Sequence, residues 1–581
     1  MMNSAWLDEF SGALRRSNPD ELVSMFAERC YWRDCVAFTW NIVTLEGRPA
    51  IEAMLRSRLA DVCPDSFELE PDGDGWFTFA TSVGRCRGHV RLENGKVSTL
   101  FTALTELKGH EEKSGASRPI GARHGAFKDR VSWGDRRKAD GEEIGHSRQP
   151  FVLIVGGGQG GIALGARLKR LDVPALIVDQ NERPGDAWRN RYNSLCLHDP
   201  VWYDHMPYLP FPDHWPVYTP KDKMGDWLEA YTKIMELDYW TSSTCKGAAY
   251  DEHRCEWSVL VQRGHREITV RPKHLVLATG VSGFPEVPRF RGSDKFKGVQ
   301  HHSSKHPGGE GWAGKKCVVV GSNNSAHDIA ADLWEHDAEV TMLQRSPTLV
   351  VRVEAMDRYG SLYSEDAARR GVTAEHADFV GASMPYALLP ALARQKMERI
   401  LKDDAEFYER LAGSGFKLTF GEDNSGLGVM SLRRGSGYYI DVGASELISS
   451  GRIKVIAAGV EQLTERGLIL DDGTRLDADL IVYATGYGSM NQWAAALISQ
   501  EVADKVGKCW GLGSDTAKDP GPWEGELRNM WKPTAQEGLW FHGGNLAMSR
   551  HYSLYLALQL KARLEGLDTP VYARAAVHHR E

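Results

Sequence analysis

The sequence contains no long apolar run, no paired-cysteine motif and no excess of positive charge. No stretch approaches the roughly 18–20 apolar residues that a membrane-spanning helix needs. The first ten residues, MMNSAWLDEF, lack the basic and apolar regions of a secretory signal, so we expect none. The net charge of −8 is carried by interspersed acidic and basic residues, which argues against nucleic acid or an anionic membrane as partner.

The cysteines indicate a reduced, cytoplasmic protein. All nine are scattered, none forms a CxxC pair, and their odd number does not fit a disulfide framework. The apolar fraction of 42% and the charged fraction of 25% are those of a globular protein. A chain of 581 residues is long enough for about three or four units of ordinary size.

A short apolar strand at Phe151–Val155 runs into a glycine-rich turn, GGGQGG, and then into a helix. Gly156 permits the tight turn, Gly158 lets the backbone approach a pyrophosphate, and Gly161 allows close helix–strand packing. The helix N-terminus offers unpaired N–H groups to phosphates. The next strand ends about 20 residues on at Asp179, which suits a ribose diol. The segment predicts a dinucleotide site, with a Rossmann-like turn that has lost its ligand as the alternative.

A second apolar strand, CVVV, enters a similar turn about 165 residues later. Gly321 keeps the first glycine position, but Asn323 and Ala326 occupy the second and third. Asparagine places a side chain where backbone normally nears phosphate, although it tolerates positive φ better than most residues. The following strand ends at Arg345 and Ser346, whose guanidinium and hydroxyl suit a 2′-phosphate. The asymmetry assigns FAD to the first turn and NADPH, rather than NADH, to the second, with a solvated strand-end charge as the alternative for the arginine.

The pattern of strands and helices divides the chain. Residues 1–115 combine a helical opening at 6–29 with strand-like runs separated by glycine and charged turns, as in a curved antiparallel sheet. Residues 116–150 have the polar composition of a linker. From residue 151 onward strands and helices alternate, which is typical of α/β domains with parallel sheets.

Two matching apolar segments, Val276–Gly280 and Ile481–Gly486, end in Ala-Thr-Gly. We interpret them as bracketing the second nucleotide unit, so that the first unit is interrupted and resumes near residue 480. An irregular stretch at 353–443 is expected to cover a substrate pocket. The predicted division is a first FAD-binding part at 151–300, an NADPH-binding domain with the substrate insertion at 301–480, and a second FAD-binding part at 481–581.

Further segments resemble the flavin-containing monooxygenases, and among them the plant YUCCA enzymes. The family fingerprint FxGxxxHxxx[YF], which ends in Trp in the Baeyer–Villiger branch, reads here Phe296, Gly298, His302 and His306. Its final aromatic position is therefore a histidine, and the fingerprint does not choose a branch. The other matching segments are WRNRYNSLCLHDP, PYLPFPDHWPVYTPK, NNSAHDIAADL with QRS, YYIDVGASELISSGRIKV, IVYATGY and FHGGNLAMSRHYSLYLALQLKA, together spanning roughly residues 151–565.

The resemblance implies two Rossmann-like dinucleotide-binding domains, one for FAD and one for NADPH, with the second inserted in the first. NADPH would reduce FAD, oxygen would add at flavin C4a to give a (hydro)peroxide, and one oxygen atom would pass to a small organic substrate. Oxidative decarboxylation of an indole-3-pyruvate-like 2-oxo acid and N- or S-oxygenation are the reactions it implies. By analogy, FAD contacts are Gly156, Gly158, Gly160, Gly161, Asp179, Trp188, His198, Thr485 and Asn545, and NADPH contacts are Gly321, Asn323, Asn324, Ser325, Arg345 and Ser346.

Alignment through Tyr192 places His198 where many family members have an asparagine beside flavin C4a. An imidazole there could hydrogen-bond the oxygenated flavin, and its ionisation could decide the protonation of that species. A histidine that bonds only the isoalloxazine or the backbone is the alternative. No metal is predicted at His301, His302 and His306, since the fingerprint accounts for His302 and no carboxylate or cysteine completes a ligand set.

Residues 1–115 resemble the NTF2/SnoaL group of cone-shaped α+β domains through WRDCVAFTW and TLEGRPAIEAML. In such a cone Arg33, Asp34 and Trp40 would be pocket residues. A role in packing, dimerisation or shaping access to the neighbouring site is the interpretation we favour for an appended module. A homodimer is left open.

Two other functions remain as alternatives to this hypothesis, and a third is excluded. Baeyer–Villiger oxidation of ketones is the enzymatic alternative. A ligand-binding or scaffold protein with a vestigial flavin site is the alternative from another class, kept open by Asn323 and His306. A disulfide reductase is excluded because no CxxC lies near either nucleotide unit.

Overall fold

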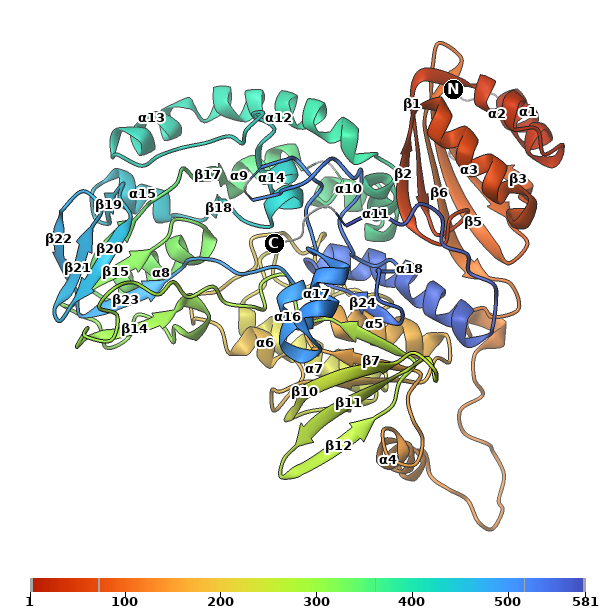
Figure 1. The fold of residues 1–581 in the computed structure, drawn as a ribbon, viewed down its shortest axis with the longest axis horizontal. Helices are drawn as coiled ribbons and strands as arrows, with labels where there is room; N and C mark the ends of the chain where they lie inside the picture. The colour runs from red at the N-terminus through yellow and green to blue at the C-terminus, as the bar shows by residue number, and fades with distance from the viewer. Residues whose placement is uncertain (1–3, 72–73, 361, 517, 578–581) are drawn as a thin grey trace.

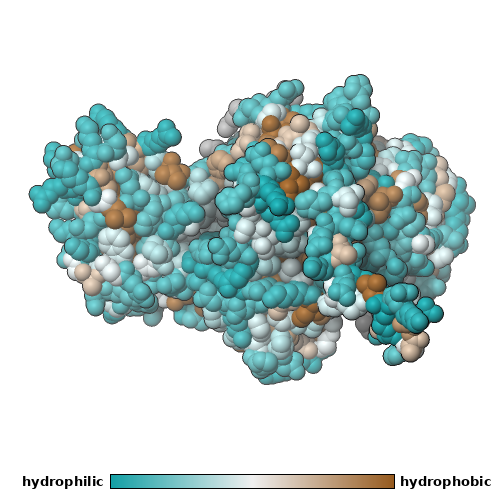
Figure 2. Space-filling view, turned by 90° about the horizontal axis from the view of Figure 1, so that it is seen from below, coloured by the Kyte–Doolittle hydropathy of each residue, from teal (hydrophilic) through white to brown (hydrophobic). Residues whose placement is uncertain are grey.

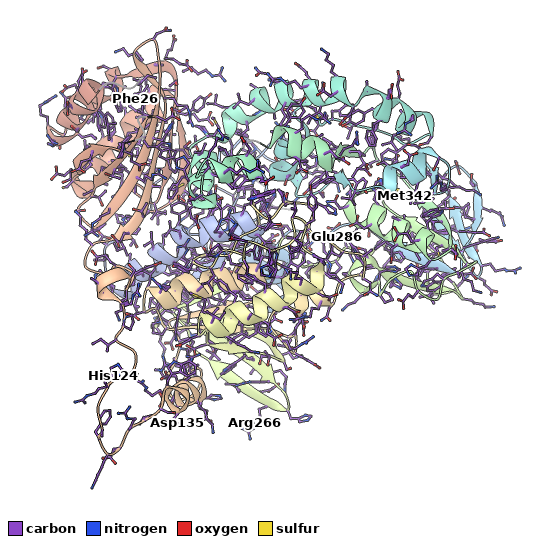
Figure 3. All side chains as sticks on the ribbon, turned by 180° about the vertical axis from the view of Figure 1, so that it is seen from behind. Phe26, His124, Asp135, Arg266, Glu286 and Met342 are labelled. Atoms are coloured by element: carbon purple, nitrogen blue, oxygen red, sulfur yellow. The ribbon has the colours of Figure 1, made fainter. Side chains whose placement is uncertain are left out.

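The computed structural model describes residues 4–71, 74–360, 362–516 and 518–577. An N-terminal α+β unit lies at one end of the molecule and the second nucleotide unit at the other, with the first nucleotide unit between and below them (Figure 1). Figure 3 marks this order, with Phe26 in the N-terminal sheet, Met342 in the far α/β sheet and Glu286 between them.

The N-terminal unit is a six-stranded sheet of order β2-β1-β6-β5-β4-β3 with helices packed on it. The helical opening ends at residue 24, short of the expected residue 29, because buried Phe26 begins a strand that pairs with Val97. The predicted α+β organisation is confirmed, and the likeness to NTF2 cones stays a prediction. The elements are α1 (Ser4–Arg15), α2 (Pro19–Ser24), β1 (Phe26–Cys35), β2 (Ile42–Glu46), α3 (Gly47–Val62), β3 (Asp65–Leu69), β4 (Trp76–Ala80), β5 (Gly84–Glu93) and β6 (Lys96–Leu107).

The segment predicted as a linker forms an exposed arm that contains a helix. Helix α4 (Trp133–Glu143) begins where the Ser132 hydroxyl accepts a hydrogen bond from the Asp135 N–H at 3.1 Å. Figure 3 shows His124 on the extended part of the arm and Asp135 on the helix beside it. A single capped helix is compatible with the polar composition, because its side chains are mostly exposed.

The first nucleotide unit is built on a five-stranded parallel sheet of order β24-β13-β7-β8-β9. Its strands are almost entirely apolar and mostly buried, as is typical of parallel sheets covered on both faces. Helix α5 (Gln159–Arg170) contacts this sheet and the long helix α18 (Leu546–Leu564). The strands are β7 (Val152–Val155), β8 (Ala175–Val178), β9 (Tyr239–Trp240), β13 (His274–Leu277) and β24 (Leu539–Phe541).

The second nucleotide unit repeats this plan in a parallel sheet of order β14-β23-β15-β16-β19, against which helix α8 (Asn324–Glu335) packs. An antiparallel three-stranded sheet accompanies each unit. The strands are β14 (Val299–His302), β15 (Lys316–Val320), β16 (Glu339–Leu343), β19 (Lys454–Ile456) and β23 (Leu480–Tyr483), with the attached sheets β10 (Ser243–Asp251), β11 (Glu256–Arg263) and β12 (Arg266–Val270), and β20 (Val460–Thr464), β21 (Gly467–Leu470) and β22 (Arg475–Asp477).

The predicted boundary near residue 480 is wrong. The strand of the second Ala-Thr-Gly segment, β23, pairs with β14 and β15 in the second sheet, so this unit extends from strand β14 to strand β23. The chain returns to the first sheet only at β24. The two Ala-Thr-Gly strands do not bracket one unit, because each lies beside the glycine-turn strand of its own sheet.

The irregular insertion is mostly helical and lies along the edge of the molecule above both sheets (Figure 1). It carries two short parallel strands that begin and end it. Its elements are β17 (Leu349–Arg352), α9 (Val353–Tyr359), α10 (Glu365–Arg369), α11 (Ala374–Ala382), α12 (Leu389–Asp403), α13 (Ala405–Gly413), α14 (Gly426–Arg434) and β18 (Tyr438–Asp441).

The surface is mixed in character. Figure 2 shows a face dominated by hydrophilic residues, with apolar side chains in scattered small patches. Within the described ranges, no helix has the length and apolar character that crossing a bilayer demands.

A buried ion pair joins the N-terminal unit to the rest of the molecule. The Arg33 guanidinium donates to both carboxylate oxygens of Glu526 at 2.7 and 2.8 Å, and both side chains are at most 3% exposed. It also donates to the Ala382 carbonyl at 2.7 Å and to the Tyr552 hydroxyl at 3.1 Å. Thr44 donates to Glu526 at 2.7 Å. One arginine thus links strand β1 to α11, to α18 and to the segment before β24.

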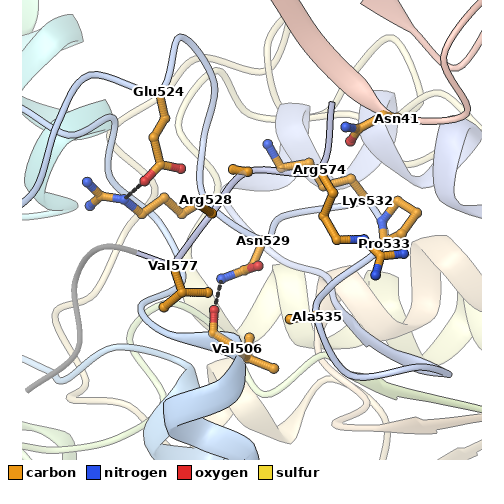
Figure 4. A pocket seen from close by; sticks show the side chains of 12 residues that line it. Asn41, Val506, Glu524, Arg528, Asn529, Lys532, Pro533, Ala535, Arg574 and Val577 are labelled. Carbon is orange, nitrogen blue, oxygen red and sulfur yellow. Dashed lines mark hydrogen bonds and ion pairs between the residues drawn. The ribbon is translucent and has the colours of Figure 1, made fainter. Parts of the chain in front are cut away.

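The C-terminal segment forms a second part of this junction. The Tyr572 N–H donates to the Thr39 carbonyl at 2.9 Å, and the Asn41 amide donates to the Tyr572 carbonyl at 2.9 Å. Figure 4 shows the small pocket beside it, where Asn41 of the N-terminal unit faces Lys532 and Arg574. The C-terminal segment is therefore held against the N-terminal unit.

We predict that Glu526→Ala lowers the stability of the protein substantially. Removing one member of a buried, hydrogen-bonded pair leaves the other charge without compensation, which costs about 3–5 kcal/mol. The measurement is the urea-unfolding midpoint, with Glu465→Gln at the exposed Lys297–Glu465 pair as control. An unchanged midpoint in Glu526→Ala would show that the pair does not hold the units together.

Candidate functional site

A large cavity lies between the two nucleotide units. Its volume is about 900 Å³, at the upper end of the range for sites that hold organic ligands. Both glycine turns line it, together with the loop that follows Tyr192 and the start of α18. The insertion adds Ser431, Gly435, Ser436, Tyr438 and Ile440 to its wall, as expected for a segment that covers a pocket.

The first position of each turn requires glycine for the same structural reason. Gly156 and Gly321 have φ of +106° and +130°, in the region that side chains disfavour. A Cβ atom would lie 2.4 Å from the Ala278 carbonyl oxygen in one turn and 2.2 Å from that of Ala484 in the other. These alanines belong to the two Ala-Thr-Gly segments, so each turn is seated on the matching segment of its own sheet.

The second position needs no positive φ in either turn. Gly158 has φ −76° and ψ −168°, and Asn323 has φ −98° and ψ −170°, so both are extended. A Cβ at Gly158 would meet no protein atom within 4 Å. The backbone of Asn323 is therefore unstrained. The two turns differ in that Asn323 carries a side chain at the position where Gly158 leaves open space.

The third position differs in packing. A Cβ at Gly161 would lie 2.0 Å from the Gly156 carbonyl oxygen, so α5 begins too close to its strand for any side chain. Ala326 at the equivalent place in α8 is fully buried and accommodated. Helix α8 therefore leaves room for a methyl group where α5 does not.

The helix N-termini at both turns are available to a ligand. No side chain caps α5 at Gly158 or α8 at Asn323, so in each helix the first N–H groups face the cavity without a side-chain acceptor. The Asn324 side chain is used elsewhere, as acceptor for the Ile440 N–H at 2.9 Å. Two such termini on one cavity fit the phosphates of two dinucleotides.

Several polar atoms of the wall also lack partners within the described part of the chain. These atoms are buried, but their residues line the cavity, so a bound ligand could supply the missing hydrogen-bond partners. They are Arg191 Nε, Asp204 Oδ2, Thr279 Oγ1, Asp328 Oδ1, Tyr487 OH and Trp493 Nε1. Together with the two helix N-termini, this donor and acceptor set fits FAD and a nicotinamide dinucleotide.

The structure brings most of the predicted site residues to this cavity. Asp179 accepts hydrogen bonds from the N–H groups of Gly157 and Asn181 at 2.6 and 2.8 Å, which fixes its carboxylate at the strand end. Trp188 donates to Gln159 at 3.2 Å, and Asn545 caps α18 and donates to the Tyr203 hydroxyl at 3.0 Å. The predicted residues that line the cavity are Gly156, Gly158, Gly160, Asp179, Trp188, His198, Asn323, Asn324, Ser325 and Asn545.

Five predicted residues lie outside the cavity wall. Gly161 and Gly321 act through packing, and the Thr485 hydroxyl donates to the Glu286 carbonyl at 2.6 Å. Arg345 and Ser346 are exposed beyond the end of β16. Their contact with a cofactor stays a prediction.

His198 is held between the two units. Its Nε2 lies 3.8 Å from Oδ2 of Asp328, a residue of α8, and the same oxygen accepts a hydrogen bond from the Tyr192 hydroxyl at 2.7 Å. Burial raises the pKa of Asp328, and the neighbouring His198 and the Tyr192 hydroxyl counteract that effect. The imidazole therefore lies beside α8 of the second unit while it lines the cavity.

The fingerprint histidines form local contacts. His302 bonds the Gly486 carbonyl at 3.1 Å and Ser304 at 3.0 Å, so it ties β14 to the end of β23. His301 and His306 contact each other at 3.1 Å. Among the described residues no group of histidine, cysteine and acidic side chains has the arrangement of a metal site.

The three residues predicted to line a pocket in the N-terminal cone instead make contacts within the protein or are buried. Arg33 makes the ion pair with Glu526, and Asp34 accepts hydrogen bonds from Phe38, Thr39 and Thr102. Trp40 is buried at 6% exposure. These contacts support the packing role over a ligand site.

Among the polar residues of the cavity that sequence reasoning missed are Arg191, Asp199, Asp204 and Asp328. Asp199 directly follows His198, which was a usable signal. The other three had none, since only the folded loop brings Asp204 back to the cavity and only the packing of α8 brings Asp328 to His198.

The fold and the cavity are those of flavoproteins that bind two dinucleotides. Comparison with known proteins identifies the family within this class. The model of the flavin-binding monooxygenase-like family matches residues 192–502. The rice (Oryza sativa subsp. japonica) indole-3-pyruvate monooxygenase YUCCA1 is 33% identical over 364 residues, covering 61% of this chain and 82% of that relative. The Arabidopsis thaliana probable indole-3-pyruvate monooxygenase YUCCA9 is 30% identical over 341 residues, covering 58% and 75%.

Solved structures agree at the level of the fold. Caprolactone-bound cyclohexanone monooxygenase in its loose conformation is 17% identical and superposes with a TM-score of 0.51 over 72% of this chain and 88% of that one. The OTEMO complex with FAD and NADP is also 17% identical, with a TM-score of 0.50 over 72% and 86%. The predicted α/β fold is confirmed.

The chain belongs to the flavin-binding monooxygenase-like family. It is a flavin-containing monooxygenase, an oxidoreductase, as the resemblance predicted. The alternative of a scaffold with a vestigial flavin site is therefore set aside.

We predict different consequences for alanine substitution at two glycines of the first turn. Gly158→Ala should leave the fold unchanged but lower the flavin content, because its methyl group enters only the space left for the ligand. Gly161→Ala should destabilise the protein by about 1–3 kcal/mol, because its methyl group meets backbone. Flavin absorbance per chain and the thermal midpoint of flavin-free protein separate the two effects.

Gly141→Ala, in exposed helix α4, is the control for both glycine variants. Full flavin content in Gly158→Ala would show that this position does not face the pyrophosphate.

Proposed function

We propose that this protein is an NADPH-dependent FAD monooxygenase that transfers one oxygen atom to a small organic molecule bound in the central cavity. The observation that carries the proposal is the pair of uncapped helix N-termini, at α5 and α8, that face one cavity from two separate sheets. When bound, FAD supplies redox and oxygen-activating chemistry and NADPH supplies the hydride.

The residues of the chain would divide the work. Gly156–Gly161 and Asp179 would hold the pyrophosphate and ribose of FAD, and the first turn of α8 would hold those of NADPH. His198, oriented by Asp328, would hydrogen-bond the reacting edge of the flavin and hold a proton there. The insertion wall would exclude water from the substrate side.

The named relatives act on indole-3-pyruvate, so a 2-oxo acid is the first substrate to test. The direct experiment is anaerobic mixing of the purified yellow protein with NADPH, followed by oxygen. Bleaching of the flavin by NADPH and oxygen-dependent return of the colour support the proposal. A flavin that NADPH does not reduce would contradict it.

We predict that His198→Ala uncouples NADPH consumption from oxygenation. Loss of the imidazole removes the group that we propose to hydrogen-bond the reacting edge of the flavin, so oxygen should be released as hydrogen peroxide. The measurement is the ratio of hydrogen peroxide to NADPH consumed in the presence of a turned-over substrate, with exposed His214→Ala as control. Unchanged coupling would remove His198 from the mechanism.

We predict that Arg345→Ala weakens the preference for NADPH over NADH. A guanidinium at the strand end pairs with the 2′-phosphate, and its loss should raise the KM for NADPH about tenfold, equivalent to about 1.4 kcal/mol. The KM for NADH should change little, because NADH lacks that phosphate. Exposed Arg475→Ala on the same unit is the control, and equal effects on both coenzymes would contradict the assignment.

A further inference from the structure

The cavity wall carries five carboxyl groups, and two of them differ from the rest. Asp179 accepts backbone N–H groups, Asp186 accepts from the Arg183 N–H and pairs with Arg189, and Asp328 accepts from Tyr192. Asp199 and Asp204 accept no hydrogen bond from any described residue. They lie on the loop that begins at His198.

Asp204 is sealed from solvent without a partner. The residue is 2% exposed, its Oδ2 has no hydrogen-bond partner, and the side chain lines the cavity. Burial raises the pKa of Asp204 well above its usual range, and the neighbouring Asp199 raises it further. Burial also raises the pKa of Asp199. A buried carboxyl in this condition gains most from a ligand that supplies a positive charge or an N–H or O–H donor.

The nearby cation is already committed. Arg550 donates to both oxygens of Asp378 at 2.7 Å and to the carbonyls of Tyr203 and His205 at 2.8 and 3.0 Å. It therefore fixes the backbone on either side of Asp204 while its charge is balanced by Asp378. The other charged group acting on this pair is His198, which pairs with Asp328.

The pair faces the proposed substrate side of the cavity. Tyr438 of the insertion is close enough to Asp199 to be affected by its charge. Tyr203, between the two acids, is bonded by Asn545 at the start of α18. The cations of the wall, Arg191 and Lys305, come from other segments and are not among the groups that act on Asp199 or Asp204.

We propose that Asp199 and Asp204 form the specificity-determining part of the substrate site, which accepts a neutral or cationic hydrogen-bond donor and rejects a carboxylate. A ligand carboxylate brings acceptors to a wall where neither Asp199 nor Asp204 receives a hydrogen bond from a described residue, whereas a donor would complete these carboxyl groups. This inference rests on the proposed oxygenation in the same cavity. It separates this chain from relatives named for indole-3-pyruvate, which is an anion.

The test is ligand binding to the flavin-loaded protein without NADPH, so it does not depend on turnover. Three probes share one ring and differ in charge: tryptamine, indole-3-acetamide and indole-3-acetate. Dissociation constants follow from the change in flavin fluorescence. We expect tryptamine to bind about tenfold or more tightly than indole-3-acetate, with the amide between them.

Asp204→Asn and Asp199→Asn, which keep the side-chain shape, should each reduce that preference about tenfold. Asp294→Asn, an exposed residue outside the cavity wall, makes the same charge change and should leave it unaltered. Thermal midpoints and flavin content verify that each variant is folded and loaded.

Tighter binding of indole-3-acetate than of tryptamine would overturn the inference. An unaltered preference in both asparagine variants, or no binding of any probe, would overturn it as well. Failure of the proposed function is a separate result, since it would appear as flavin that NADPH does not reduce while the binding series can still be measured.

Discussion

The close approach of each glycine turn to the neighbouring strand is the constraint on which the rest of this molecule depends. At the ends of the two nucleotide-turn strands, Gly156 and Gly321 adopt a positive φ and pass close to the carbonyls of Ala278 and Ala484. That seating aims the first turn of each following helix at the cavity. Because both units use it, two helix N-termini meet one space from two directions.

The sequence predicted the repeated parts of the fold well, because they depend on local patterns. Apolar strand, glycine turn, helix and second strand follow one another within about 30 residues, and hydrophobic periodicity records them. The division of the chain near residue 480 was wrong for a physical reason. The Ala-Thr-Gly segments look alike since each supports a glycine turn, and this likeness says nothing about which sheet a strand joins.

The candidate site divides in the same way. Residues of the turns and of the loop with His198 were predicted because they lie within recognisable motifs. Asp204 and Asp328 could not be, since their importance comes from burial and from neighbours remote in sequence. Arg345 was predicted from its place at a strand end, and the structure puts it there, exposed and outside the cavity wall.

The junction of the N-terminal unit connects to the cavity through a short series of contacts. Arg33 bonds Ala382 at the end of α11 and Tyr552 on α18. These helices also carry Asp378 and Arg550, whose pairing holds the backbone beside Asp204. A unit remote from both dinucleotide turns therefore touches the same helices that support the substrate wall.

The burial of Arg33 against Glu526 also restricts how this protein can change over evolutionary time. Either residue without the other lowers the stability of the protein, because an unpaired buried charge destabilises the folded state more than a neutral residue does. Replacing either residue by a neutral one while the interface stays buried leaves the other charge unpaired, so two positions more than 490 apart in the sequence depend on each other. Although the sequence of the N-terminal unit resembles that of an independent module, its contact with the rest of the chain contains a matched pair of buried charges.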